Sequence, residues 1–521
     1  MEKLFNGNII QGSVEHWAQV KPDEAAVIDE NGNILKWGDW NEQSNLLAEA
    51  LAEEGVTEGS TVGVRTQMRL EWFVINRALA KLGCKQVGVN YRLTPGEVKG
   101  ILADSNAKVL ISDDHLPSKL TKELSDVLHV NINEKEFLEI KNYEVIMSNA
   151  TMKKRFSQMP NPPLIIYTSG TTGAPKGVFL SPEIRQQRAK EIQEYFADVF
   201  RMSVRMPTDL NLVTMPFHHS AGPAVSAAAH LVGEPVIILS KFDPERALQL
   251  IQEYKITNWT CVPTMIKRLS KLPQEVLNKY DVSSIKIVEV GAAPIPEATK
   301  RWAISHFGNC LVEGYGTSEV YMVSTMLPEM QLVKPASSGR MYNHAQVSIR
   351  DENNNALPIG EKGEIWVKTP MTIDRYYNRE PLGLDTIDEK GFFRTGDIGY
   401  LDEEQYLYIA DRSKDMIIRG GVNIYPAEIE AAIIKHPDVM DVAIIGIPHD
   451  DLGEEIKAFC HLNEGATLTA EELISFCKNE LALYKNPSSI EFVDQLPYSA
   501  VGKILKRDLR DPFWKDKERS V

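Results

Sequence analysis

The stretch from Tyr167 to Val178 carries hydroxyl groups, glycines and one lysine directly after an apolar run. Glycines bring backbone N–H groups close to an anion, because their backbone takes conformations that other side chains forbid. Hydroxyls add hydrogen-bond donors, and a lysine supplies positive charge. This combination predicts a loop that holds phosphates, with contacts from Thr168, Ser169, Gly170, Thr171, Thr172 and Lys176.

Two other interpretations fit this stretch less well. A Walker A loop has the pattern G-x-x-x-x-G-K-[ST], but counting from Gly170 puts Pro175 at the second glycine and Gly177 at the residue that binds Mg²⁺. A surface turn would explain the glycines, but not four hydroxyls and a lysine in this order. We therefore expect a phosphate loop of another kind.

The same stretch resembles the signature of the adenylate-forming enzymes, [YST]-[ST]-S-G-[ST]-T-G-x-P-K-G. That family includes acyl-CoA synthetases, aryl-CoA ligases, peptide-synthetase adenylation domains and beetle luciferase. Further motifs of the family continue as far as Lys503, so the resemblance covers nearly the whole chain. It implies that ATP, Mg²⁺ and a carboxylic acid meet in one cleft.

By this resemblance, the hexapeptide from Gly314 to Glu319 would bind the nucleotide. Tyr315 would stack on adenine, Thr317 would contact the α-phosphate, and Glu319 would bind Mg²⁺, a metal that prefers carboxylate and phosphate oxygens. The other residues expected at the nucleotide from this part of the chain are Gly291, Ala292, Ala293, Gly314 and Gly316.

The motif from Arg394 to Asp397 resembles the family's ribose-binding segment. Asp397 would accept hydrogen bonds from both ribose hydroxyls, since a carboxylate offers two acceptor oxygens. Arg412 would approach the same ribose. The alternative for Asp397 is an exposed turn, a position that aspartate favours.

The longest match to the family runs from Asp411 to Glu430 and places Lys414 at its hinge. Rotation there would let one cleft serve two half-reactions, with Gly420 and Gly421 beside the CoA channel. Lys503 matches a lysine that would stabilise the charge developing on the α-phosphate. His219 aligns with the family's gate residue, so the catalytic set that we expect is Lys503, Thr317, Glu319 and His219.

Strands and helices must bring these motifs together. Apolar runs at 62–64, 87–89 and 109–111 alternate with helical stretches, and the same rhythm returns after the phosphate loop. Such alternation predicts mostly parallel sheets with helices on both faces. Glycine- and hydroxyl-rich turns follow the carboxyl ends of the strands, which is the edge where these sheets bind ligands.

The pattern then changes twice. Short alternating strands between 340 and 410 predict a β-rich subdomain, and a capping box at Thr469 and Glu472 marks a helix in a compact α+β unit that follows. The predicted fold class is α/β. A large N-terminal adenylation domain (1–411) would contain two doubly wound α/β subdomains and the β-rich subdomain, and a smaller mobile α+β domain would cover 412–521.

Composition limits the partners and the compartment. The 521 residues carry a formal net charge of −15, which argues against nucleic acid or an anionic membrane as the main partner. The five cysteines show neither metal-site spacing nor a disulfide framework. No apolar run approaches the roughly 18 residues of a membrane span, and we see no signal segment. We expect a cytoplasmic protein, with a homodimer left open.

These features predict an acyl-CoA synthetase, an ATP-dependent acid–thiol ligase of fatty acid metabolism. The acid would attack the α-phosphorus of ATP, pyrophosphate would leave, and CoA would attack the acyl-AMP. No carrier segment follows Lys503 in this sequence, which favours CoA. The alternatives are transfer to a separate carrier protein, a non-catalytic nucleotide- or acyl-binding protein, and a luciferase-like oxidase. The expected pocket segments are apolar and lack arginine and lysine, which predicts a hydrophobic monocarboxylic acid, fatty or aromatic.

Overall fold

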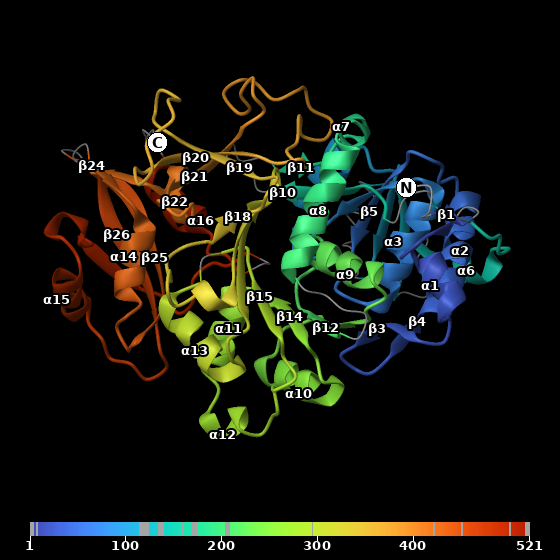
Figure 1. The fold of residues 1–521 in the computed structure, drawn as a ribbon, viewed down its shortest axis with the longest axis horizontal. Helices are drawn as coiled ribbons and strands as arrows, with labels where there is room; N and C mark the ends of the chain where they lie inside the picture. The colour runs from blue at the N-terminus through green and yellow to red at the C-terminus, as the bar shows by residue number, and fades with distance from the viewer. Residues whose placement is uncertain are drawn as a thin grey trace.

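A computed structural model describes residues 5–6, 9–113, 124, 126–133, 140–155, 157, 161–168, 175–203, 209–293, 295–419, 422–449, 452–499 and 502–515. Figure 1 shows a large α/β body formed by the N-terminal part of the chain, with a smaller domain, orange to red, beside it. Among the expected site residues, Ser169, Gly170, Thr171, Thr172, Gly420 and Gly421 lie outside the described residues.

The first subdomain is built on a seven-stranded sheet that is parallel except at one edge pair. Its strands, in sheet order, are β11 (Lys176–Val178), β10 (Leu164–Thr168), β6 (Lys85–Gly88), β5 (Thr61–Arg65), β7 (Val109–Ser112), β8 (Leu128–Asn131) and β9 (Ile140–Asn142). Helices α2 (Trp37–Glu53) and α3 (Leu70–Leu82) pack on one face, and α4 (Pro95–Asp104) packs on the other. This confirms the doubly wound arrangement.

The second subdomain holds a nine-stranded sheet whose central strands are parallel. Its strands, in sheet order, are β18 (Arg340–Met341), β17 (Tyr321–Met326), β16 (Leu311–Thr317), β15 (Ile287–Val290), β14 (Asn258–Cys261), β12 (Asn211–Val213), β13 (Val236–Ile238), β3 (Ala25–Asp29) and β4 (Ile34–Lys36). Helices α10 (Pro244–Tyr254), α11 (Pro263–Leu269) and α13 (Glu297–Phe307) bury their apolar faces in one core with this sheet. Helix α9 (Ala221–Leu231) contributes Ala229 to the core of the first subdomain.

A four-stranded antiparallel sheet forms the predicted β-rich subdomain, with the order β19 (Gln346–Arg350), β20 (Gly363–Lys368), β21 (Phe393–Leu401) and β22 (Leu407–Arg412). The sequence did not predict strand β21, because the polar run from Arg394 to Asp397 interrupts the apolar alternation. The turn alternative for Asp397 is wrong, since this residue lies within β21 and is only 3% exposed.

The small domain has a five-stranded sheet of β24 (Val422–Ile424), β23 (Ile417–Arg419), β26 (Gly453–Leu462), β25 (Val439–His449) and β27 (Ser489–Phe492). Helices α14 (Pro426–Ile433) and α15 (Ala470–Glu480) contribute Ile429, Ile433 and Leu473 to its core. The predicted capping box is present, because Thr469 N–H donates to Glu472 at 2.9 Å and Glu472 N–H donates to Thr469 at 3.3 Å.

Outside these sheets, the described residues also form the strands β1 (Phe5–Asn6) and β2 (Ile9–Ile10) and the α-helices α1 (Val14–Val20), α6 (Tyr143–Asn149), α7 (Pro182–Gln187), α8 (Ala189–Ser203), α12 (Gln274–Leu277) and α16 (Lys506–Arg510). All five cysteines are buried and free. Within the described ranges, no helix has the length and apolar character needed to cross a membrane.

Candidate active site

A cleft of about 3030 Å³ lies at the carboxyl edge of the parallel strands of the nine-stranded sheet. It is lined by the segments that follow β12, β14, β15 and β16, which contribute His219, Thr264, Ala292 and Glu319 respectively. The other expected residues in the lining come from all parts of the chain. The first subdomain contributes Thr168 and Lys176, the β-rich subdomain contributes Asp397 and Arg412, and Lys414 and Lys503 follow it in the chain. The second subdomain contributes Gly291, Ala293, Gly314, Tyr315, Gly316 and Thr317. The structure therefore brings together, around one cleft, all of the expected site residues that it describes.

The hairpin of β16 and β17 shows why the hexapeptide from Gly314 to Glu319 needs a glycine at position 316. Thr317 pairs with Tyr321, so Glu319 lies in the turn between the two strands. The register shifts between Tyr315 and Gly316, and a Cβ added at Gly316 would lie 2.1 Å from the carbonyl oxygen of Tyr321. Only glycine fits that position, so the hairpin can hold an aromatic ring, a hydroxyl and a carboxylate within five residues.

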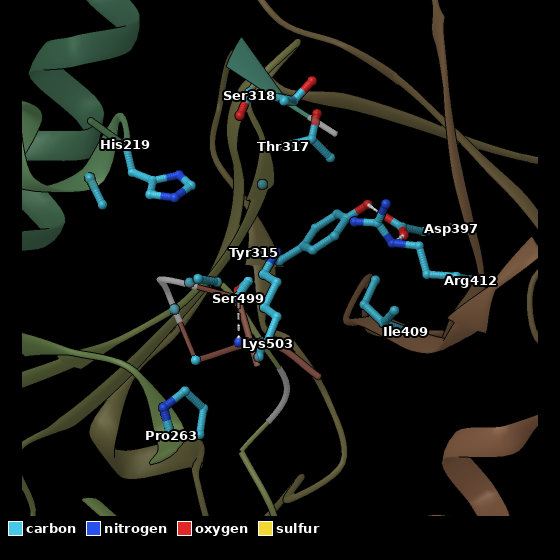
Figure 2. A pocket seen from close by; sticks show the side chains of 18 of the residues that line it. His219, Pro263, Tyr315, Thr317, Ser318, Asp397, Ile409, Arg412, Ser499 and Lys503 are labelled. Atoms are coloured by element: carbon cyan, nitrogen blue, oxygen red, sulfur yellow. Dashed lines mark hydrogen bonds and ion pairs between the residues drawn. The ribbon is translucent and has the colours of Figure 1, made fainter. Parts of the chain in front are cut away.

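A three-residue polar cluster joins this hairpin to the β-rich sheet (Figure 2). The hydroxyl of Tyr315 donates to Oδ2 of Asp397 at 2.7 Å, and Nε of Arg412 lies 2.6 Å from Oδ1 of the same carboxylate. Burial and the Asp397 charge raise the pKa of Tyr315 well above its usual value, so its phenol stays protonated and donates. The Asp397 charge likewise raises the pKa of Arg412.

Lys503 reaches the same cleft from the small domain. Figure 2 shows it extending from the loop of Ser499 toward Tyr315, with His219 on the other side of the cavity. Burial lowers the pKa of Lys503 to about 8, and the positive charge of Arg412 acts in the same direction. The carboxylates of Asp397 and Glu319 oppose this shift, so the ammonium group sits among both signs of charge.

Two adjacent histidines follow β12. Burial lowers the pKa of His219 to about 4, with a contribution from the charge of Lys503, so its ring is neutral near pH 7. His218 is 5% exposed, and burial lowers its pKa to about 3. The rings lie 4.8 Å apart, and neither nitrogen of His218 has a hydrogen-bond partner among the described residues.

Thr317, Glu319 and Lys176, the residues expected at the phosphates, line another part of the cleft. The hydroxyl oxygen of Thr317 is buried without a hydrogen-bond partner in the described structure. Tyr376 lies beside both Glu319 and Lys176. Its hydroxyl is 3.5 Å from Oε1 of Glu319, and the ammonium of Lys176 is 5.1 Å from the centre of its ring. Sequence reasoning missed Tyr376, because a single tyrosine outside any motif carries no signal.

The segment at the predicted hinge is held by local contacts. Arg510 donates to the backbone oxygen of Lys414 at 3.1 Å, and burial lowers the pKa of Lys414. Asp411 accepts a hydrogen bond from Ala427 N–H at 2.7 Å, which ties the end of β22 to the first turn of α14. The segment therefore links the β-rich sheet to the small domain.

Comparison with known proteins identifies the family of this chain. The model of the AMP-binding enzyme family matches residues 14–377, and the model of the AMP-binding enzyme C-terminal domain matches residues 428–503. A 2-succinylbenzoate–CoA ligase of Geobacillus kaustophilus is 32% identical over 95% of this chain and 96% of its own length. The long-chain-fatty-acid–CoA ligase FadD13 of Mycobacterium tuberculosis is 31% identical over 95% and 97%.

Two further relatives widen the range of acceptors and ligands. A fatty acid–[acyl-carrier-protein] ligase, ScoC of Streptomyces coeruleorubidus, is 30% identical over 97% of this chain and 96% of its own length. The solved structure of the o-succinylbenzoate CoA synthetase MenE of Bacillus subtilis with its acyl-adenylate OSB-AMP has a TM-score of 0.81 at 28% identity, covering 96% of this chain and 97% of that one. The chain thus belongs to the AMP-binding enzyme family and is an adenylate-forming ligase that resembles the acyl- and aryl-CoA ligases.

Proposed function

We propose that this protein is an acyl-CoA synthetase that activates a hydrophobic monocarboxylic acid as acyl-AMP and then transfers the acyl group to CoA. One observation carries the proposal: Lys503 of the small domain extends into the cleft that also holds the cluster of Tyr315, Asp397 and Arg412. A cation beside a nucleoside-binding cluster can neutralise charge that develops on an α-phosphate during displacement.

The nucleoside would bind at the cluster. Each oxygen of Asp397 already has one donor, Tyr315 or Arg412, and a carboxylate can accept about four hydrogen bonds in total. The remaining acceptor sites suit the two hydroxyls of a ribose, while the ring of Tyr315 offers a flat face to adenine. Lys414 would act as the hinge, and the small domain would turn there between the two half-reactions.

The residues on the phosphate side fit Mg-ATP. The unpartnered hydroxyl of Thr317 and the ammonium of Lys176 suit phosphate oxygens. Among the residues that the structure describes, no three His, Cys, Asp or Glu side chains are grouped as a metal site. Mg²⁺ commonly binds through one or two carboxylates plus substrate phosphates, so Glu319 alone would suffice on the protein side. The bound metal would neutralise phosphate charge.

The acid would lie along α9 and the start of α11. Small apolar side chains line this side of the cleft: Ala221, Ala224, Val225, Ala228 and Pro263. From Phe217 to Leu231 the only ionisable side chains are three histidines, so the α9 wall offers no fixed cation for a second carboxylate. Lys267 on α11 also lines the cleft, but its ammonium is paired with Asp441. An apolar pocket of this kind favours a fatty or aromatic monocarboxylic acid.

A carrier protein is the second candidate for the thiol acceptor, because the relative ScoC is a fatty acid–[acyl-carrier-protein] ligase. A carrier-protein thiol and the CoA thiol carry the same phosphopantetheine group, so both would use the same acyl-AMP. We propose CoA as the acceptor, because the 2-succinylbenzoate and long-chain-fatty-acid relatives of similar identity are CoA ligases. We propose the cytoplasm as the location.

A pyrophosphate-release screen tests the proposal. Purified protein with ATP and Mg²⁺ is given fatty acids of increasing chain length, benzoates and cinnamates, each with and without CoA. Turnover that requires one class of acid and CoA supports the proposed function. Pyrophosphate release that CoA does not accelerate favours a carrier-protein acceptor, and no release with any acid contradicts the proposal.

A further inference from the structure

The loop that carries Lys503 is closed by its own hydrogen bonds. Tyr498 and Ile504 form an antiparallel bridge at its base, and Leu505 N–H donates to the oxygen of Pro497 at 2.8 Å. Lys503 N–H donates to the hydroxyl of Ser499 at 3.1 Å. These bonds tie the described residues 497–499 to residues 502–505, so whatever holds Tyr498 also bears on the position of Lys503.

The base of this loop is joined to the large domain through one carboxylate. The hydroxyl of Tyr498 donates to Oδ2 of Asp441 at 2.5 Å, and Nζ of Lys267 on α11 lies 3.5 Å from Oδ1 of the same residue. The side chains of Lys267 and Asp441 are 19% and 18% exposed, so solvent screens this pair less than a surface pair. Burial lowers the pKa of Lys267, and the charge of Asp441 opposes that shift.

Helix α11 meets the tip of the loop as well. A Cβ added at Gly502 would lie 2.6 Å from the hydroxyl oxygen of Thr264, and Gly502 has a φ of +72°. The backbone beside Lys503 therefore rests directly against α11, at a position where only glycine fits. At the outer edge, Lys271 donates to Asn463 of the small domain at 3.2 Å.

Thr264, Lys267 and Lys271 are spaced at i, i+3 and i+7, which places them on one side of α11 and the turn after it. The same helix lines the cleft with Pro263 and Thr264 beside the proposed acid pocket. One short helix thus contacts both the place where the acid would bind and the loop that brings in Lys503.

We propose that Lys267, Asp441 and Tyr498 are positioning residues that hold the loop of Lys503 against α11 during the acid-activating step. This inference rests on the proposed function. All three border the cleft, but their polar groups are paired with one another, so we assign them to holding the loop. They raise the fraction of molecules in which Lys503 stands in the cleft. Their loss should slow formation of the acyl-AMP and leave its reaction with CoA unchanged.

Two half-reactions measured separately test this inference. Acid-dependent exchange of labelled pyrophosphate into ATP reports acyl-AMP formation, and thioester formation from chemically prepared acyl-AMP and CoA reports the second step. Lys267→Ala, Asp441→Asn and Tyr498→Phe should each lower the exchange rate by about three- to tenfold, since each removes one partly buried polar contact. The thioester rate should stay within about twofold of the wild type.

Three controls sharpen the result. Lys267→Arg keeps the charge and should restore most of the exchange rate. Lys267→Ala combined with Asp441→Asn should lose little more than either single variant, because both break the same contact. Lys279→Ala removes an exposed lysine elsewhere in this subdomain and should change neither rate. An equal loss of rate in both half-reactions, or an unchanged rate of pyrophosphate exchange, would overturn the inference.

Hydrogen exchange gives a readout that needs no catalysis. The amides of Gly502, Lys503 and Leu505 are hydrogen-bonded within the loop, and Lys267→Ala should increase their exchange rates severalfold, while amides in β26 stay protected. If the wild type exchanges no pyrophosphate with any acid, the proposed function fails, and this measurement still decides whether α11 holds the loop. If the hydrogen-exchange rates of these loop amides are unchanged in Lys267→Ala, the inference is refuted.

Discussion

Asp397 and Arg412 stand opposite each other on the neighbouring strands β21 and β22, with Nε of Arg412 2.6 Å from Oδ1 of Asp397. The pairing of the two strands fixes this contact before any nucleotide arrives. The arginine side chain remains 43% exposed, whereas the aspartate side chain is 4% exposed. The carboxylate is therefore held in place at the wall of the cleft.

Replacing Asp397 should weaken nucleotide binding. Asp397→Asn keeps the shape but loses the negative charge, and hydrogen bonds to a charged group contribute about 1.5–3 kcal/mol each. We expect the KM for ATP to rise by about ten- to a hundredfold, with a smaller rise for Tyr315→Phe, which removes one neutral donor. Steady-state kinetics at saturating acid measures this. Asp23→Asn, at a side chain that is 94% exposed, is the matched control; an unchanged KM in Asp397→Asn would exclude the ribose assignment.

The rate of acyl-AMP formation should fall in alkali. Burial lowers the pKa of Lys503 to about 8, and a lysine carries its charge below its pKa. If the charged form is required, kcat/KM for pyrophosphate release should be constant below about pH 8 and fall about tenfold per pH unit above it. Lys503→Arg should lower the rate but remove this alkaline limb, since arginine stays charged. If Lys503→Arg shows the same alkaline decrease in rate as the wild type, that decrease comes from another group.

The metal requirement should depend on Glu319. Glu319→Gln removes the negative charge of the proposed ligand, so the Mg²⁺ concentration for half-maximal pyrophosphate release should rise by about tenfold or more. Titration with Mg²⁺ at fixed ATP measures this. Glu329→Gln changes an exposed residue beyond the far end of the same hairpin and should have no effect. An unshifted Mg²⁺ curve in Glu319→Gln would mean that the metal is held elsewhere.

A buried charge cluster should dominate the stability of the first subdomain. Glu15 is ion-paired with Arg77, and its Oε1 lies 3.4 Å from Nζ of Lys81. Removing one partner of a buried pair leaves an uncompensated charge, so Glu15→Gln should lower the free energy of unfolding by about 3–5 kcal/mol. Urea denaturation followed by circular dichroism measures this. The control is Glu297→Gln, whose exposed pair with Arg301 should contribute no more than about 0.5 kcal/mol.

The same cluster should make stability sensitive to acid. Burial alone would raise the pKa of Glu15, but the charges of Arg77 and Lys81 outweigh it and lower the pKa below 4.5. A carboxylate with a depressed pKa stabilises the fold above its ordinary pKa and loses that effect as the pH falls through the lowered value. Wild type and Glu15→Gln should therefore converge in stability toward low pH, and a constant difference would contradict the assignment.

Regular patterns in the sequence predicted the regular parts of the fold. The apolar run at 62–64 forms β5, the helical stretch expected after it forms α3 over Leu70–Leu82, and the capping box at Thr469 begins α15. These elements depend on local spacing, which the sequence carries directly. The motifs also predicted which residues line the cleft, since the turns after parallel strands meet at one edge of a sheet.

Contacts between distant segments could not be predicted in this way. Strand β21 was missed because its polar residues line the cleft and interrupt the alternation of apolar and polar residues that marks a strand. The pair of Lys267 and Asp441 joins two domains, and neither residue lies in a recognisable motif. Tyr376 reaches Glu319 because its segment pairs with β11 at Val178 and because Ile373 N–H donates to the backbone oxygen of Glu319 at 3.0 Å.

The most direct test of the central claim is to analyse all products of one reaction in wild type and in Lys503→Ala. With ATP, Mg²⁺, CoA and the acid selected by the screen, the wild type should form AMP, pyrophosphate and acyl-CoA in equal amounts. Lys503→Ala should lose about 10²- to 10³-fold in this rate, the usual cost of removing one group that stabilises transition-state charge, while still converting prepared acyl-AMP to acyl-CoA. Formation of ADP and phosphate, or an unchanged rate in Lys503→Ala, would contradict the account.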